Sequence, residues 1–161
     1  MGFIKVKLLD EENYSKYGKL LVKKPVAPDV DREYLKYWHD LYDIDISGEK
    51  TIGFLEIIRQ EFVVDRLERH ITGPEVFKLN HGAGLMAFAP GTDVNDPDSV
   101  PNQDEIDVFI LDGSLSLTIN TGVWHFPPLP ITPSMGIFVI APKQVSDDID
   151  MKCFEPINIL L

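Results

Sequence analysis

Glycine and proline interrupt this chain so frequently that they divide it into short segments. The 161 residues include 11 glycines and 12 prolines, and many of the segments between them alternate apolar with polar residues. Short alternating segments bounded by turn residues are typical of a β-sandwich or β-barrel. A chain of this length is expected to form one domain with a buried core. We therefore predict an all-β, antiparallel barrel with one or two short helices, in a single domain over 1–161.

The positions of these glycines and prolines also predict where the strands lie. We expect strands over 4–9, 51–60, 62–69, 75–80, 84–89, 106–111, 114–120, 123–126, 136–141 and 151–160. The segment 51–60 is apolar on both faces and rich in β-branched residues, so we expect it to be buried on both sides. Asp112-Gly113 stands between two alternating runs, which predicts a tight hairpin there. Asp10 is expected to cap a short helix that ends at Gly18.

The composition argues against several classes of partner. The net charge is −11 and no basic run is longer than Lys23-Lys24, so nucleic acid is not expected as a partner. No apolar run approaches the roughly 18 residues of a membrane span, and the N-terminus lacks the apolar core of a signal peptide. The single Cys153 cannot form an intramolecular disulfide. We therefore expect a cytoplasmic protein that acts on a small molecule.

Four side chains form the pattern that is most informative about function. Glu68 and His70 are two residues apart in an expected strand, so they point to the same face. A turn at 72–74 follows, which allows Glu75 to reach the same space from the next strand. His125, in Gly122-Val123-Trp124-His125, belongs to a later strand and can point into the same cavity. Nitrogen and oxygen ligands that converge in this way suit a divalent metal ion, whereas the alternative is hydrogen-bonded histidines and surface glutamates.

An arginine completes the list of candidate site residues. Arg59 ends an otherwise apolar face formed by Leu55 and Ile57. Its guanidinium could bind the carboxylate of a substrate, or it could form a salt bridge at the end of the strand. Both interpretations fit the sequence equally well.

Several elements, in order along nearly the whole chain, resemble one enzyme family. The two histidine motifs are similar to those of the cupin superfamily, with Glu68 where the first histidine usually stands. More narrowly, the chain resembles the ureidoglycolate lyase family, also called ureidoglycolate hydrolase. The matching elements are Tyr17-Gly18, Tyr37-Trp38-His39-Asp40-Leu41, Arg59, Leu67-Glu68-Arg69-His70 with Gly73 and Phe77, and Val123-Trp124-His125 with Pro127.

The resemblance implies a cupin-type barrel and a lyase that cleaves (S)-ureidoglycolate to glyoxylate and urea in allantoin and purine degradation. It implies a metal site formed by Glu68, His70, Glu75 and His125, with Arg59 on the substrate carboxylate. Glu68 or Glu75 could instead be the catalytic base. We also expect a homodimer.

The chain departs from the family pattern at a few positions. Leu115 and Ile119 replace polar residues, Phe126 replaces a second histidine, and Glu75 replaces a glutamine. A lost polar contact to the substrate would change specificity. Two alternatives therefore remain: a cupin enzyme that acts on a different small acid or sugar derivative, and a cupin that binds a small molecule without catalysis.

Overall fold

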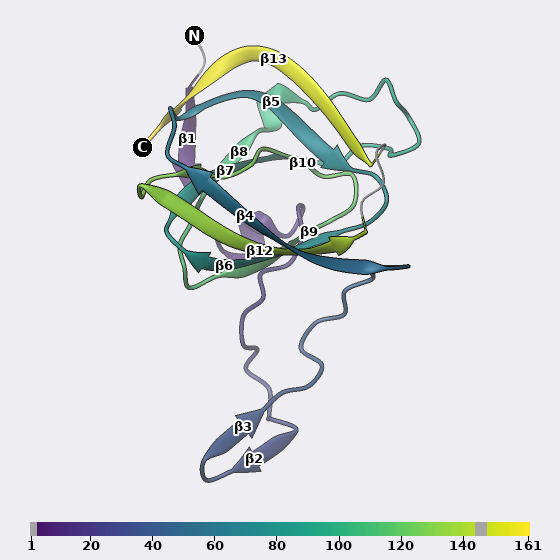
Figure 1. The fold of residues 1–161 in the computed structure, drawn as a ribbon, viewed down its shortest axis with the longest axis vertical. Helices are drawn as coiled ribbons and strands as arrows, with labels where there is room; N and C mark the ends of the chain where they lie inside the picture. Colours follow the sequence, from purple (N-terminus) through teal and green to yellow (C-terminus); the bar gives the residue numbers. More distant parts are fainter. Residues whose placement is uncertain (1–2, 144–147) are drawn as a thin grey trace.

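The computed structural model describes residues 3–143 and 148–161. Two β-sheets face each other in a barrel-like arrangement, and a small hairpin projects away from them (Figure 1). The prediction of a nearly all-β barrel is confirmed. Within the described ranges, no helix is long and apolar enough to cross a membrane.

The larger sheet has seven strands. In spatial order they are β10 (Trp124–His125), β5 (Val63–His70), β13 (Ile149–Leu160), β1 (Phe3–Lys7), β8 (Asp107–Leu111), β7 (Gly84–Ala89) and β11 (Leu129–Pro130). Strand β10 also pairs with β7, so the sheet curls until its two ends meet. Strand β1 pairs in parallel with both β13 and β8, which is the exception to the antiparallel arrangement that we expected.

The smaller sheet has four antiparallel strands. Their order is β4 (Lys50–Ile58), β12 (Ser134–Pro142), β6 (Glu75–His81) and β9 (Ser116–Ile119). Strand β4 pairs with β12 along its whole length, from Lys50 opposite Pro142 to Ile58 opposite Ser134. It therefore forms one edge of this sheet.

Four short elements complete the described structure. Helix α1 (Glu11–Tyr14) begins at Asp10, whose side chain accepts a hydrogen bond from the backbone of Asn13, as the sequence predicted. The 3₁₀ helix η1 (Gln103–Glu105) precedes β8. Strands β2 (Val30–Arg32) and β3 (Leu35–Tyr37) pair only with each other and form the projecting hairpin (Figure 1).

The two faces of the larger sheet carry separate hydrophobic cores. Met86 and Phe88 of β7 point between the sheets, where Tyr14 packs edge-on against Phe88 at a centroid distance of 5.3 Å. Leu85 and the alternate residues of β7 point to the opposite face and pack around Trp124. The alternation of strand side chains thus separates the interior of the barrel from a second core behind the sheet.

Two sequence predictions about individual elements are wrong. Asp112-Gly113 does not form a β-hairpin, because β8 and β9 belong to different sheets. Asp112 instead accepts hydrogen bonds from the backbone and hydroxyl of Ser114, which turns the chain from one sheet to the other. Strand β4 is not buried on both sides, because only Leu55 and Ile57 of its residues are partly buried. Its even-numbered side chains point outward.

Candidate active site

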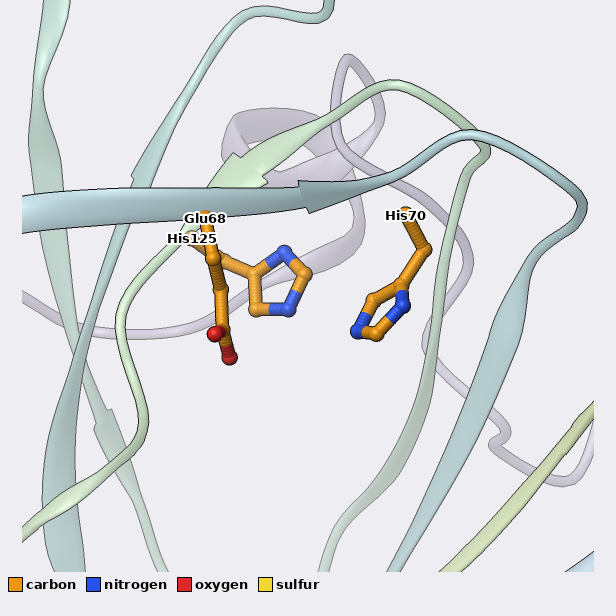
Figure 2. Close-up of side chains that lie close together, drawn as sticks. All are labelled: Glu68, His70 and His125. Carbon is orange, nitrogen blue, oxygen red and sulfur yellow. The ribbon is translucent and has the colours of Figure 1, made fainter. Parts of the chain in front are cut away.

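The four side chains of the sequence motif meet at one cavity between the two sheets. Glu68 and His70 point inward from the end of β5, His125 from β10, and Glu75 from the start of β6. Strands β5 and β10 pair with His125 directly opposite Glu68, which brings both histidines to the same side. Figure 2 shows that Glu68, His70 and His125 point toward one common space.

Local backbone geometry explains how the histidine motif reaches the cavity. Gly122 has a φ of 79°, in the left-handed region where glycine has no steric penalty. Its backbone N–H donates to the carbonyl of His70 at 2.9 Å, which ties the turn before β10 to the end of β5. His125 then points inward, and Trp124 packs in the core behind the sheet.

The cavity has a volume of about 310 Å³, which suits a small organic molecule. Its polar end is formed by the two histidines and the two glutamates. The remaining wall is mainly apolar, formed by Leu55, Phe77, Val139, Ala141 and Ile149. None of the lining residues within the described parts of the chain is a lysine or an arginine.

Glu75 lies between the two histidines. Its Oε2 is 3.4 Å from Nε2 of His70 and 3.4 Å from Nε2 of His125. These contacts are electrostatic rather than well-formed hydrogen bonds, and Oε2 has no hydrogen-bond partner among the described residues. All three residues are at most 8% exposed. A buried carboxylate oxygen without a hydrogen-bond partner is costly, so this position is suited to a cation.

Hydrogen bonds set the orientation of both imidazole rings. Nδ1 of His70 contacts Oδ2 of Asp148 at 2.9 Å, and Nδ1 of His125 contacts the carbonyl of Val123 at 3.0 Å. Carboxylate and carbonyl oxygens only accept, so each Nδ1 must be the donor. In the neutral rings both Nε2 atoms therefore keep a free lone pair that faces Glu75.

Burial and neighbouring charges shift the pKa values of Glu75 and His125. Burial raises the pKa of Glu75, but the neighbouring His125 and His70 lower it by more, so the net shift is downward. Burial lowers the pKa of His125, whereas the carboxylates of Glu75 and Glu68 raise it by more, so its net shift is upward. These opposite shifts favour a charged histidine–carboxylate pair when no cation is bound.

The donor atoms fit a divalent metal ion. In a tetrahedral site with bonds of roughly 2.0–2.1 Å, neighbouring ligand atoms are about 3.3 Å apart. The 3.4 Å separation between Glu75 and each histidine nitrogen is close to that value. Glu68, His70 and His125 also offer ligand atoms within 4.8 Å of one another. The unpartnered oxygen of Glu75 is the second observation that favours a cation here.

Arg59 lies apart from the other predicted site residues. It follows the end of β4 and is exposed, with its guanidinium 5.7 Å from the ring centroid of Phe62. The lining residues of β4 lie toward its other end, and Leu55 is the last of them. At about 3.3 Å per residue, Arg59 is roughly 13 Å further along the strand. Strand parity was right for this residue, but its position along the strand separates it from the cavity of its own chain.

Asp148 is a site residue that sequence reasoning missed. Besides His70, it accepts hydrogen bonds from the backbone N–H of Thr72 at 2.9 Å and from the hydroxyl of Thr72 at 2.5 Å. Burial raises the pKa of Asp148, and the bonds from Thr72 and His70 lower it by more, so it remains a carboxylate. No spacing in the sequence connects it to His70, because the two are 78 residues apart.

Of the departures from the family pattern, Glu75 lies in the cavity, whereas the three apolar ones do not reach it. Ile119 is buried in the core between the sheets, and Phe126 is buried in the core behind the larger sheet. Leu115 is partly buried in the turn before β9. None of the three lines the cavity. The expectation that Leu115 removes a substrate contact therefore has no support from the geometry.

Solved structures with a similar fold are distant from this chain. CapF bound to the inhibitor 3-isopropenyl-tropolone is 16% identical, with a TM-score of 0.44 over 86% of this chain and 32% of that chain. The capsular polysaccharide assembling protein CapF from Staphylococcus aureus is 18% identical, with a TM-score of 0.44 over 83% of this chain and 33% of that chain. The chain thus spans about a third of the length of these proteins.

Sequence families give a clearer assignment. No curated protein matches this chain. The family model described as ureidoglycolate lyase matches residues 1–160, which is nearly the whole chain. The chain therefore belongs to the ureidoglycolate lyase family.

Proposed function

We propose that this protein cleaves ureidoglycolate to glyoxylate and urea in the cavity between β5, β6 and β10. The observation that carries the proposal is the family match over residues 1–160. The inward-facing Glu68, His70, Glu75 and His125 support it, because they supply a base and ligands for a metal at one place.

His70, His125 and Glu75 are the residues that would hold a divalent ion. Such an ion would supply Lewis acidity toward the oxygens of the substrate. Asp148 keeps Nε2 of His70 directed at the site by accepting the hydrogen bond from Nδ1.

Glu68 is the residue that we assign as the base. It is less buried than Glu75, and no hydrogen bond from the described residues fixes its carboxylate. Glu68 accepts the proton of the substrate hydroxyl as the carbon–oxygen bond becomes a carbonyl. The carbon–nitrogen bond breaks with its electron pair on the urea nitrogen, and Glu68 returns the proton to that nitrogen. The products are glyoxylate and urea, and Glu68 is again a carboxylate.

The test is an assay of both products from (S)-ureidoglycolate, combined with a metal analysis. We expect the wild type to release glyoxylate and urea in equal amounts. Glu68→Gln should lower kcat by roughly 100-fold or more with metal content unchanged, because the amide cannot accept the proton. Glu155→Gln, an exposed glutamate on β13, is the matched control and should retain activity. Full activity of Glu68→Gln would contradict the base assignment.

A further inference from the structure

Strand β4 has one edge without a neighbouring strand. Among residues 3–143 and 148–161 it pairs with β12 alone. The backbone N–H of Arg59 donates to Pro133, and the carbonyl of Glu49 accepts from Lys143, on the β12 side. Odd-numbered residues therefore direct their backbone polar groups toward β12. The even-numbered residues of β4 direct theirs toward the open edge.

The outer face of β4 is apolar as well as exposed. Ile52 and Ile58 are 73% and 74% exposed, and the outward ring of Phe54 packs on Phe138 of β12. An exposed nine-residue edge strand with apolar side chains is a template for pairing with another chain. The sequence pattern also predicts burial on both sides of this strand. A strand paired with the edge of β4 would cover apolar side chains that the sequence predicts to be buried.

Apart from its two histidines, the described lining of the cavity beside β4 has no side chain that can carry a positive charge. Ureidoglycolate carries a carboxylate, and the described lining includes no lysine or arginine. Arg59 has the same inward parity as Thr51 and Leu55, which line the cavity, but it lies at the other end of the strand. In an antiparallel partner strand, which runs in the opposite direction to β4, the same arginine would lie beside the cavity.

We propose that a second copy of this chain pairs with β4 about a two-fold axis, and that each copy supplies Arg59 to the cavity of the other. Antiparallel pairing places the end of the partner's β4 beside the start of β4. The register that sets Ile52 opposite the partner's Ile58 buries the two most exposed isoleucines of the strand. The same register sets Thr51 opposite the partner's Arg59. Opposite residues share a face, so this arginine points to the cavity side.

The proposed contact suits a second copy because the surface is self-complementary. A two-fold strand pairing uses the same residues on both subunits and completes both cavities at once. The paired segment from Ile52 to Ile58 includes one charged residue, Glu56, whose carboxylate already lies 3.3 Å from His81. The net charge of −11 is therefore carried mainly elsewhere on the surface, and little like charge meets at the contact.

Disulfide trapping tests the pairing without reference to catalysis. In a Cys153→Ser background, which removes the native thiol, we expect Ile52→Cys/Ile58→Cys to form a covalent dimer under mild oxidation. Opposite residues in an antiparallel pair have Cα atoms about 5.5 Å apart, within the range of a disulfide. Either single cysteine variant should remain uncross-linked, because residue 52 lies opposite residue 58. A monomeric wild type in sedimentation equilibrium, or equal cross-linking of the single variants, would overturn the pairing.

Subunit complementation tests the role of Arg59, which rests on the proposed lyase function. Arg59→Ala and His125→Ala should each be nearly inactive alone. Mixed dimers of the two variants contain one intact cavity, so an exchanged equal mixture should recover about a quarter of the wild-type activity. If Arg59 serves its own chain, no dimer contains an intact cavity, and the absence of recovery would refute the exchange. Arg66→Ala, an exposed arginine on β5, is the control and should stay active.

Failure of the lyase assay would not obscure these results. If the wild type releases no glyoxylate from ureidoglycolate, the proposed function is wrong, whereas the cross-link still decides the pairing. Oxalate binding, measured by calorimetry, then replaces turnover in the complementation. Arg59→Ala should bind oxalate at least about 10-fold more weakly than the wild type, as expected when a guanidinium–carboxylate contact is lost. Equal affinity, or no gain in binding sites on mixing, would overturn the assignment of Arg59.

Discussion

At the scale of single residues, the site is defined by which nitrogen and oxygen atoms are already engaged. Both histidines donate from Nδ1 and present Nε2 to Glu75. Strand parity predicted that Glu68 and His70 share a face, because side chains alternate strictly along a strand. Asp148 could not be predicted in this way. Its bond to His70 depends on how β13 approaches β5, which no local pattern reports.

Asp148→Asn tests the orienting hydrogen bond. An amide nitrogen can face Nδ1 of His70, which would disfavour the tautomer that leaves Nε2 free. We expect zinc affinity, measured by competition calorimetry, to fall by about 10–100-fold. Asp65→Asn, at a half-buried position of β5 outside the cavity, should leave the affinity unchanged. Wild-type affinity in a folded Asp148→Asn protein would contradict the orienting role.

At the scale of elements, sequence patterns predict the strands but not which strands pair or which end of a strand lines the cavity. The predicted strands and their faces are largely present, because apolar alternation reports burial directly. The alternation does not predict which strand pairs with which. The runs on either side of Asp112-Gly113 would suit a hairpin, yet β8 and β9 enter different sheets. Arg59 likewise has the predicted face, but its distance from the cavity depends on which end of β4 lines it.

The loop after β7 shows how one buried side chain can hold an irregular segment. Arg69 is 1% exposed, pairs with Asp150 at 2.9 Å, and stacks 4.6 Å from the ring centroid of Trp124. Its guanidinium also donates to the hydroxyl of Thr92 and to the carbonyls of Asp93 and Asp96. A lysine cannot reproduce this planar set of donors.

Arg69→Lys should therefore loosen the loop and destabilise the fold. We expect the free energy of unfolding in urea to fall by about 2 kcal/mol, because several partly buried acceptors lose their donor. Amide exchange in the 92–96 segment should accelerate by more than in β7. Arg66→Lys, at an exposed position of the same strand, should have little effect on either measurement. Equal stability of the two variants would show that the guanidinium contacts contribute little.

At the scale of the whole molecule, the N-terminal segment closes the larger sheet. Strand β1 lies between β13 and β8, with Lys5 opposite Leu160 near the end of β13. Asp107 of β8 links this segment to the barrel. Its carboxylate pairs with Lys7 at 2.5 Å and Lys16 at 3.0 Å, and it accepts a hydrogen bond from Tyr17 at 2.8 Å. These contacts join residues about a hundred positions apart.

The ionisation of Asp107 should make the stability of the fold depend on pH. Burial raises its pKa, but bonds from Lys7, Tyr17 and Lys16 lower it by more, so the folded pKa lies below the unfolded value. The stabilising contribution is therefore complete above the unfolded pKa of roughly 3.9 and is lost as pH falls through the folded pKa.

We expect Asp107→Asn to lower the free energy of unfolding by about 1–2 kcal/mol at pH 7. The difference from the wild type should shrink as the pH falls below about 4, because the wild-type carboxylate becomes protonated. Urea unfolding at several pH values measures both. A difference that stays constant down to pH 3 would show that the charge of Asp107 is not the source of the effect.

The most direct test of the account is the rate at which matched histidine variants act on (S)-ureidoglycolate. His125 is buried beside Glu75, whereas His81 is exposed at the end of β6 and outside the cavity. We expect the wild type to release glyoxylate and urea, His125→Ala to lose roughly 100-fold or more in kcat/KM, and His81→Ala to remain within about 2-fold. No product from the wild type, or equal rates for the two variants, would contradict the assignment of this cavity as the catalytic centre.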